Sequence, residues 1–258
     1  MCAEVVVLAG AGGYTSGMTG QRTAYDDPRF HGRRKSRPLK PRQQRLVEHL
    51  LPRLSLRQLP EKALRYPHAL FSPPPARMAL EIGFGGGEHL AHMAKTHPDW
   101  GFIGAEPFVN GIAKLLAAIE DDNLANIRIW PDDARALLPL LGDASLDRIF
   151  LLYPDPWPKK RHHKRRFVNP RNLAQIHRVL KPGGEFLFAS DIGDYVRWTL
   201  RHVLAHGGFE WLAERPADWR EPPPGWPGTR YEAKALREGR TPVYLRFKKG
   251  GGPPAAPA

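Results

Sequence analysis

The chain has 258 residues, of which 41% are hydrophobic and 25% charged. These values are typical of a globular protein with one large domain or two small ones. A single cysteine, Cys2, excludes a disulfide framework and a cysteine zinc site. No stretch approaches the roughly 18 uninterrupted apolar residues of a membrane helix. The apolar start lacks a basic segment, so we expect no export signal and a cytoplasmic location.

The net charge of +13 is concentrated in two segments. Residues 29–45 contain eight Lys or Arg and residues 159–166 contain six, with no acidic residue in either segment. The two segments together carry slightly more positive charge than the whole chain, so the net charge of the remaining residues is close to zero. Such a distribution predicts a polyanionic partner such as a nucleic acid. The alternative is two solvated surface runs without a partner.

The ends of the chain differ from its centre. Residues 1–20 contain no basic residue, and Met18 is a candidate for the true start. We expect residues 1–28 to be a disordered extension, and the Gly, Pro and Ala tail at 250–258 to be disordered. Residues 29–249 are predicted to form one domain, with a basic arm and then a helix whose face carries Leu46, Leu50, Leu51 and Leu54.

Strand and helix patterns alternate after residue 75. Strands are predicted at residues 78–82, 101–105, 127–130, 148–153 and 185–189, and a late pair at 209–213 and 243–247. Helices are predicted at residues 88–96, 109–119, 134–141, 170–180 and 195–204, the fourth closed by a Lys-Pro-Gly-Gly terminator. The alternation indicates an α/β fold with an open, mostly parallel sheet and helices on both faces. We expect no helix between the last two strands, which form an antiparallel edge.

Glycines and carboxylates follow three successive predicted strands. The first strand ends in an E-x-G-x-G-x-G pattern that contains Glu81, Gly83 and Gly85, while Glu106 ends the second strand and Asp133 follows the third. The carboxyl ends of parallel strands meet at one edge of a sheet, where ligands bind. An acidic residue about 20 positions after the glycines can bind the hydroxyls of a ribose.

The glycine loop favours one kind of cofactor. No P-loop lysine follows it, which disfavours a nucleoside triphosphate, and the acid at Glu81 would repel a pyrophosphate. S-adenosylmethionine has a ribose, an amino group and a sulfonium but no phosphate. We interpret Glu81 as a contact to its amino-acid end, Glu106 to its ribose and Asp133 to its adenine.

A carboxylate also follows the fourth predicted strand. Asp155 lies between Pro154 and Pro156, which stiffen the backbone, and it precedes Trp157 and the basic run at 159–166. A phosphate-binding run therefore adjoins the predicted crevice. The alternative role for Asp155 is to satisfy amides of its own turn. No ligand partners converge on His162 or His163, so no metal site is predicted.

This region resembles the signature of bacterial tRNA (guanine-N7)-methyltransferases. The resemblance rests on the Pro-Asp-Pro-Trp segment with the basic residues after it, on the cofactor loop at residues 80–85, and on Thr229, Tyr231, Glu232, Lys234 and Gly239 near the C-terminus. It covers about residues 29–249. Ser190 stands where the family pattern has threonine.

The resemblance implies a Rossmann-like class I methyltransferase with a seven-stranded sheet, acting on guanine 46 in the variable loop of tRNA. It implies cofactor contacts from Glu81, Gly83, Gly85, Glu106, Asp133 and Asp155, with Asp155 as the active-site acid. The implied substrate contacts are Lys159, Asp191, Thr229, Arg230, Tyr231 and Glu232. The implied RNA-contacting residues are Arg161, His162, His163, Lys164, Arg165 and Arg166.

The chemistry of guanine N7 needs no general base, because this nitrogen carries a lone pair and no proton. A carboxylate beside the ring would stabilise the charge that develops on methylation, and we give this role to Asp155. Asp191 or Glu232 would read the base edge, although the division among the three acids stays open. So does the oligomeric state. The alternatives are a methyltransferase acting on another RNA atom and a non-catalytic RNA-binding module with a decayed cofactor fold.

Overall fold

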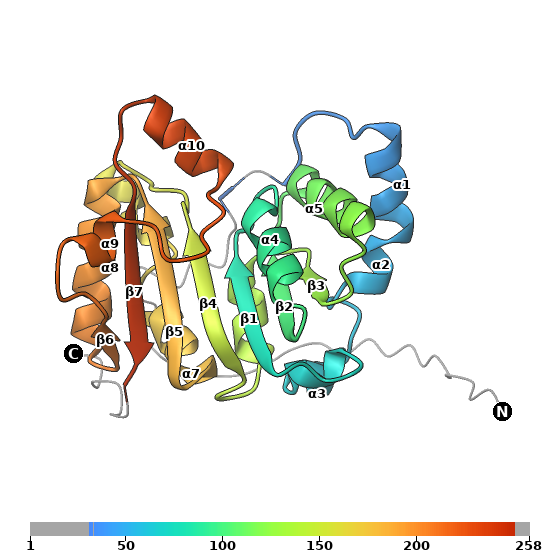
Figure 1. Cartoon of the computed structure of the whole chain (residues 1–258), viewed down its shortest axis with the longest axis horizontal. Coiled ribbons are helices and arrows are strands. Elements are labelled where there is room, and N and C mark those ends of the chain that lie inside the picture. The colour runs from blue at the N-terminus through green and yellow to red at the C-terminus, as the bar shows by residue number, and fades with distance from the viewer. Residues whose placement is uncertain (1–30, 33, 251–258) are drawn as a thin grey trace.

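The computed structural model describes residues 31, 32 and 34–250 (Figure 1). The predicted extension at 1–28 and residues 251–258 of the predicted tail lie outside the described residues. Gly250, which we had grouped with the tail, belongs to the fold, because its N–H donates to the carbonyl of Gly208 at 3.0 Å.

Seven strands form one sheet in the order β3-β2-β1-β4-β5-β7-β6. All neighbouring pairs from β3 to β5 are parallel, and β7 is antiparallel to both β5 and β6. The mostly parallel sheet with an antiparallel edge pair is therefore confirmed. The strands are β1 (Arg77–Ile82), β2 (Trp100–Ala105), β3 (Ile127–Trp130), β4 (Leu146–Leu152), β5 (Leu180–Ser190), β6 (Phe209–Trp211) and β7 (Val243–Lys249).

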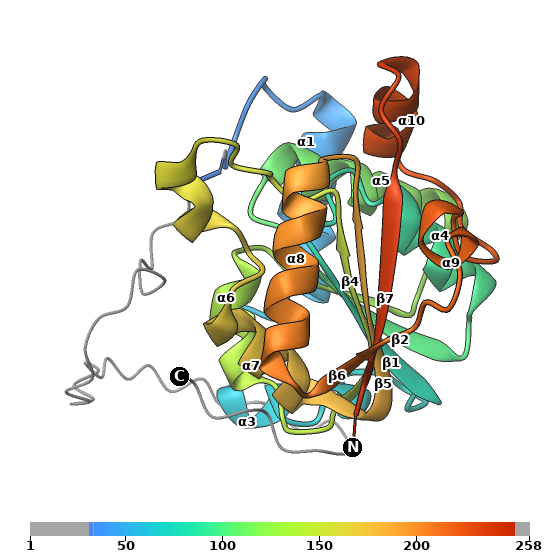
Figure 2. The ribbon, with the colours of Figure 1, turned by 90° about the vertical axis from the view of Figure 1, so that its left-hand side faces the viewer.

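Helices cover both faces of this sheet, with α4 and α5 on one face and α6, α7 and α8 on the other (Figure 2). The α-helices are α1 (Pro41–His49), α2 (Leu51–Leu54), α3 (Glu61–Leu64), α4 (Glu88–Thr96), α5 (Val109–Asp122), α6 (Ala134–Leu137), α7 (Pro170–Val179), α8 (Gly193–His206), α9 (Ala217–Arg220) and α10 (Arg230–Arg237). The 3₁₀ helices are η1 (Pro67–Leu70), η2 (Leu138–Leu140) and η3 (Lys160–Arg165).

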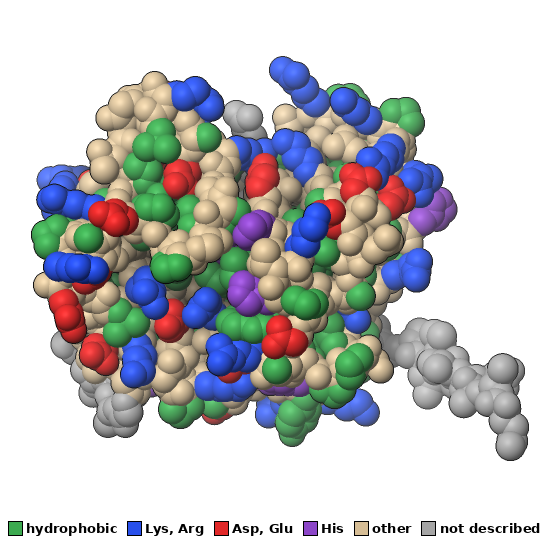
Figure 3. Space-filling view, viewed as in Figure 1, with side chains coloured by type: hydrophobic (Ala, Val, Ile, Leu, Met, Phe, Trp, Pro, Cys, Tyr) green, Lys and Arg blue, Asp and Glu red, His purple; other side chains and the backbone are tan. Residues whose placement is uncertain are grey.

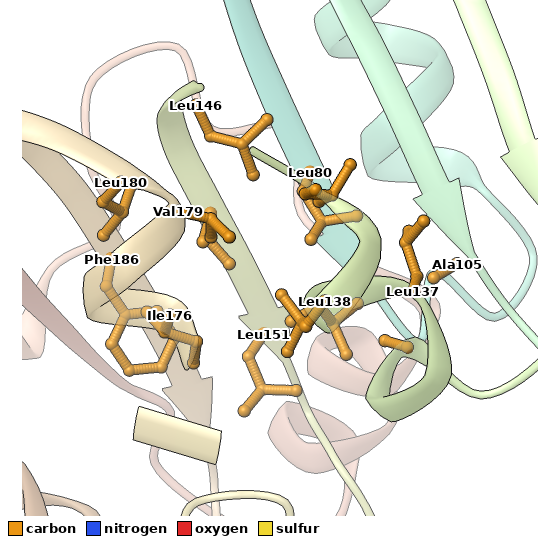
Figure 4. Packing of buried hydrophobic residues seen from close by; sticks show 14 of the residues in the cluster. Leu80, Ala105, Leu137, Leu138, Leu146, Leu151, Ile176, Val179, Leu180 and Phe186 are labelled. Carbon is orange, nitrogen blue, oxygen red and sulfur yellow. The ribbon is translucent and has the colours of Figure 1, made fainter. Parts of the chain in front are cut away.

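The core has two halves because side chains alternate along each strand. On β1, Leu80 faces the cluster that contains α6, α7 and α8, while Ala79 faces the cluster that contains α4 and α5. Leu80, Leu151, Ile176 and Phe186 pack together in the first cluster (Figure 4). Leu46 of α1 is buried in the second cluster, and Leu50, Leu51 and Leu54 pack against it. The predicted leucine face therefore joins the core, but it is divided between α1 and α2.

Two expectations about the second half of the chain were wrong. The short helices α9 and α10 lie between β6 and β7, where we expected no helix. They have four and eight residues. Helices this short, within a proline-rich stretch, show no clear helical periodicity in the sequence. In addition, α7 ends at Val179 as the Lys-Pro-Gly-Gly terminator predicts, but β5 begins at Leu180 and not at residue 185. The terminator therefore lies inside the strand, with Gly183 at φ +75° and a register shift against β4.

Candidate active site

A cavity of about 560 Å³ opens at the carboxyl ends of the parallel strands. The last residue of β1, Ile82, is in register with Ala105 of β2 and Leu151 of β4, and Ala105 is in register with Trp130 of β3. The segments that follow these strands therefore meet around one space. The cavity is lined by, among others, Gly83, Gly85, Glu106, Asp133, Arg135, Tyr153, Asp155, Trp157, Arg165, Arg230 and Tyr231.

The glycine loop between β1 and α4 forms the floor of this cavity. Gly83 and Gly85 have φ values of +70° and +59°, a region that glycine occupies without steric cost. Helix α5 packs closely against this loop, because a Cβ added at Gly111 would lie 2.0 Å from the carbonyl oxygen of Gly85. Our sequence analysis missed Gly111. A glycine inside a predicted helix is the signal that could have revealed it.

Glu106 fixes the glycine loop from the end of β2. Its carboxylate accepts hydrogen bonds from the N–H of Gly85 at 2.8 Å and of Phe108 at 2.9 Å. Burial raises the pKa of this carboxyl, and the two backbone donors and Arg230 oppose the rise. Carboxylate oxygens have about four lone-pair sites, so Glu106 retains acceptor capacity toward the cavity.

Asp133 lines the cavity between β3 and α6, where it is held by Arg135. One carboxylate oxygen of Asp133 caps α6 by accepting from the N–H of Arg135 at 2.9 Å. The other accepts from Nε and Nη2 of the same arginine at 2.8 and 2.6 Å. Sequence analysis did not select Arg135. Asp133 and Arg135 thus form an ion pair, and both residues line the cavity.

Asp155 lies in a strained loop after β4. Tyr153 and Trp157 have φ values of +49° and +43°, which are rare for bulky side chains and concentrate at functional sites. Asp155 is exposed at the mouth of the cavity. Desolvation by the cavity walls still raises the pKa of its carboxyl, and no charge or hydrogen bond from the described residues opposes this. The loop thus presents an uncompensated carboxylate.

The start of α10 covers the glycine loop. A Cβ added at Gly85 would lie 3.3 Å from Nη2 of Arg230 and 3.4 Å from Cε2 of Tyr231. The hydroxyl of Thr229 caps this helix by accepting from the N–H of Glu232 at 3.1 Å. Residues almost 150 positions apart in the chain therefore form opposite walls of one site.

Three predicted carboxylates do not line the cavity. Glu81 is buried below the glycine loop and pairs with His89 at 2.7 Å. Asp191 pairs with Nε of Arg240 at 2.5 Å. Glu232, in the first turn of α10, is buried. We expected these three side chains to contact the cofactor or the guanine directly, but none of them lines the cavity.

The carboxylate of Glu232 faces the protein interior. One oxygen accepts from Nε1 of Trp226 and the other from the hydroxyl of Tyr244, both at 2.6 Å. The ring of Trp226 also packs 4.9 Å from the ring of His89. Glu232 therefore anchors α10 to the sheet, and its buried position outside the cavity lining does not favour the expectation that it reads the edge of the base.

The basic run divides into exposed and buried members. Lys159, Lys160, Arg161 and Lys164 are exposed, and His162 and His163 are half-buried. The guanidinium of Arg165 stacks on Trp157 at 5.0 Å and lines the cavity. The side chain of Arg166 is 0% exposed, so the expectation that it contacts RNA does not fit its position.

The basic arm also divides into two groups. Arg34 pairs with Asp132, and Arg42 and Arg45 pair with Glu120 of α5. The exposed cations Lys35, Arg37 and Lys40 remain beside the site. Figure 3 shows Lys and Arg side chains along the upper margin of the molecule, over the regions of α1 and α10 in Figure 1.

The described residues contain neither a cluster of metal ligands nor a membrane-spanning helix. Within residues 34–250, together with 31 and 32, no group of three or more His, Cys, Asp or Glu side chains could hold a metal ion. In this same part of the chain, no helix is long and apolar enough to span a bilayer.

Solved structures share this fold at low sequence identity. A 16S rRNA methyltransferase, KamB, aligns with a TM-score of 0.52 and 17% identity, over 68% of this chain and 89% of its own. The 16S rRNA (adenine(1408)-N(1))-methyltransferase of Catenulisporales acidiphilia aligns with a TM-score of 0.50 and 17% identity, over 77% of this chain and 97% of its own. The sheet order and these structural matches define the Rossmann-like fold of class I methyltransferases.

Sequence comparison identifies the family within this class. Residues 75–245 match the family profile described as "Methyltransf_4: Putative methyltransferase". The tRNA (guanine-N(7)-)-methyltransferase of Agrobacterium fabrum is 56% identical over 89% of this chain and 99% of its own length. The enzyme of the same name from Rhizobium meliloti is 56% identical over 90% of this chain and 100% of its own. The chain belongs to the tRNA (guanine-N7)-methyltransferase family.

Proposed function

We propose that this protein transfers the methyl group of S-adenosylmethionine to N7 of guanine 46 in tRNA. The observation that carries the proposal is the cavity itself, where Glu106, Asp133 and Asp155 meet the glycine loop beside exposed cations. A non-catalytic RNA-binding role would not require an open cavity with an uncompensated carboxylate.

The cavity fits S-adenosylmethionine in size and chemistry. Its volume of about 560 Å³ lies within the range of small-molecule sites, about 300–1,000 Å³. Glu106 would accept from the ribose hydroxyls with the oxygen lone pairs that Gly85 and Phe108 leave free. Asp133 would face the adenine, and the positive φ values of Gly83 and Gly85 let the ligand approach the backbone. When bound, S-adenosylmethionine supplies an electrophilic methyl group on a sulfonium.

The work of the protein in this reaction is alignment and charge stabilisation. Guanine N7 attacks with its own lone pair, so no residue needs to remove a proton. The reaction requires N7 to lie in line with the carbon–sulfur bond. The ring becomes cationic as the N7–carbon bond forms. The carboxylate of Asp155, which lines the cavity, would stabilise that developing charge.

Asp155 is also the best candidate to hold the guanine. Glu232 is buried against Trp226 and Tyr244, Asp191 is paired with Arg240, and neither of these two acids lines the cavity. A carboxylate can accept from N1–H and the exocyclic amine of guanine, a pattern that adenine lacks. Tyr231 is exposed at the mouth of the cavity and can stack on the base.

Cations on both sides of the cavity would hold the tRNA backbone. Lys159, Lys160, Arg161 and Lys164 flank the loop of Asp155, and Lys35, Arg37 and Lys40 lie on the arm. Phosphate contacts of this kind set affinity and orientation. Because tRNA is the substrate, we place the enzyme in the cytoplasm, and we assign residues 29–249 to one catalytic domain.

Methyl transfer to defined tRNAs tests the function. The protein is incubated with methyl-labelled S-adenosylmethionine and unmodified tRNA, and the nucleosides are identified by mass spectrometry after digestion. We expect label in 7-methylguanosine, and none in a matched tRNA that carries adenine at position 46. Label on another atom, or equal label in the matched tRNA, would overturn the assignment of N7 or of position 46.

A further inference from the structure

The last arginine of the basic run is built into the protein interior. The side chain of Arg166 is 0% exposed, whereas Lys160, Arg161 and Lys164 in the preceding turn are exposed. The 3₁₀ helix η3 ends at Arg165, and the chain then turns inward toward Val168, which is fully buried. A buried guanidinium is costly unless it is paired and hydrogen-bonded, so its partners indicate what it does.

Three of those partners lie on α8 and hold the guanidinium in place. Nη2 of Arg166 donates to Asp194 in the first turn of α8. The guanidinium also lies 5.0 Å from the ring centres of Tyr195 and Trp198 on the same helix. Arginine stacks well on aromatic faces while donating in its own plane. Arg166 is thus fixed to α8, an element of the rigid core.

The fourth partner belongs to the active-site loop. Nε of Arg166 donates to the carbonyl of Pro156 at 2.9 Å, one residue beyond Asp155. Pro154 and Pro156 have no N–H, so backbone carbonyls are the main groups by which the fold can hold this segment. At the other end of the loop, the N–H of Tyr153 donates to the carbonyl of Ala189 at 2.7 Å. Asp155 lies between these two tethers.

We propose that Arg166 is a positioning residue that ties the Asp155 loop to α8 and does not contact RNA. This inference rests on the proposed methyl transfer. The strained φ values at Tyr153 and Trp157 require external support, because an untethered loop would relax out of them. Displacement of an aligned group by about 1 Å can cost about a hundredfold in rate, so loss of this tether affects the chemical step.

The test separates positioning from RNA binding. Single-turnover methylation is measured at saturating tRNA and S-adenosylmethionine, and tRNA affinity is measured across salt concentrations. Arg166→Lys keeps the charge but loses the guanidinium geometry. We expect its rate to fall by about tenfold to a hundredfold, with tRNA affinity and its salt dependence unchanged. Lys164→Ala should show the reverse, with weaker binding and a log–log salt slope smaller by about one.

Two additional variants keep the test decisive if Arg166→Lys folds poorly. Asp194→Ala removes the acidic partner of Arg166 from a half-exposed position, and it should slow the chemical step without weakening tRNA binding. Arg197→Ala is the matched control. It removes a second, exposed arginine that lies 4.0 Å from Asp194 and should change neither quantity. In Arg166→Ala, added methylguanidinium should restore part of the rate, and it should not help Lys164→Ala.

The outcomes distinguish this inference from the proposed function. If the wild-type protein does not methylate tRNA at N7, the proposed function fails. If the wild type is active and the Arg166 and Asp194 variants are equally fast, the positioning role is wrong. If Arg166→Lys weakens tRNA binding and flattens the salt slope while its saturated rate stays normal, the residue contacts RNA.

Discussion

Nδ1 of His89 lies 2.7 Å from the carboxylate of Glu81, and the two side chains are only 2% and 3% exposed. This pair connects the end of β1 to the first turn of α4, on either side of the glycine loop. The ring of His89 also contacts Trp226, which donates to Glu232 at the start of α10. A continuous set of buried contacts therefore joins the floor of the cavity to its cover.

Loss of His89 should destabilise the fold. His89→Ala leaves the carboxylate of Glu81 buried without its partner, which should lower the free energy of unfolding by about 3 kcal/mol. Urea denaturation measures this change. The double variant Glu81→Gln, His89→Ala should recover part of the loss. A loss below about 1 kcal/mol in His89→Ala would show that the pair contributes little.

Loss of Glu106 should weaken cofactor binding. Glu106→Ala removes a charged acceptor from the proposed ribose site, at a cost of about 2 kcal/mol, or more than tenfold in affinity. Titration calorimetry with S-adenosylhomocysteine is the measurement. Glu210→Ala, an exposed acid on β6, serves as the control. Equal affinity in the two variants would remove Glu106 from the binding site.

The exposed cations should set the salt dependence of tRNA binding. Replacing Lys160, Arg161 and Lys164 with alanine should reduce the log–log salt slope by about two to three. Replacing Arg42 and Arg45 should have a smaller effect, because they pair with Glu120. Filter binding between low and physiological salt makes the comparison. An equal loss of slope in both variants would mean that the Arg42 and Arg45 ion pairs open when tRNA binds.

Asp155 should control the chemical step. Asp155→Asn keeps the size of the side chain and removes its charge, so methyl transfer should slow by about a hundredfold while tRNA binding persists. Single-turnover assays measure the rate. The wild-type rate should also rise with pH through the titration of this carboxyl, because protonation removes the same charge. A near-normal rate in Asp155→Asn would remove the residue from the mechanism.

The same substitution should stabilise the free protein at neutral pH. Desolvation by the cavity walls raises the pKa of Asp155, so the folded state disfavours the ionised form. The contribution of this group is fully present below its unfolded pKa and is lost as the pH rises through its folded pKa. The melting temperature of Asp155→Asn should therefore exceed that of the wild type at about pH 7, and the difference should shrink toward about pH 3.5. A constant difference would contradict this cause.

Much of the fold was predictable because its signals are local. Apolar strand runs, amphipathic helices and the glycine turn after Ile82 are short-range patterns, and the parallel sheet follows from their alternation. The strand-end rule also brought Glu106, Asp133 and Asp155 to one edge. Helix α10 was missed because it has only eight residues, and the two that are buried, Glu232 and Ala235, form no apolar repeat.

The sequence by itself determined the fold class, the family resemblance and which segments meet at the cavity, because periodicity and motif spacing are properties of neighbouring residues. Only the tertiary structure decided which charged side chains face that cavity. Arg165 and Arg166 are adjacent and chemically identical, yet one stacks on Trp157 at the cavity and the other lies buried against α8. The burial and ion pairing of each arginine depend on partners distant in the chain, such as Asp194 for Arg166. A local sequence pattern therefore cannot predict which arginine is buried.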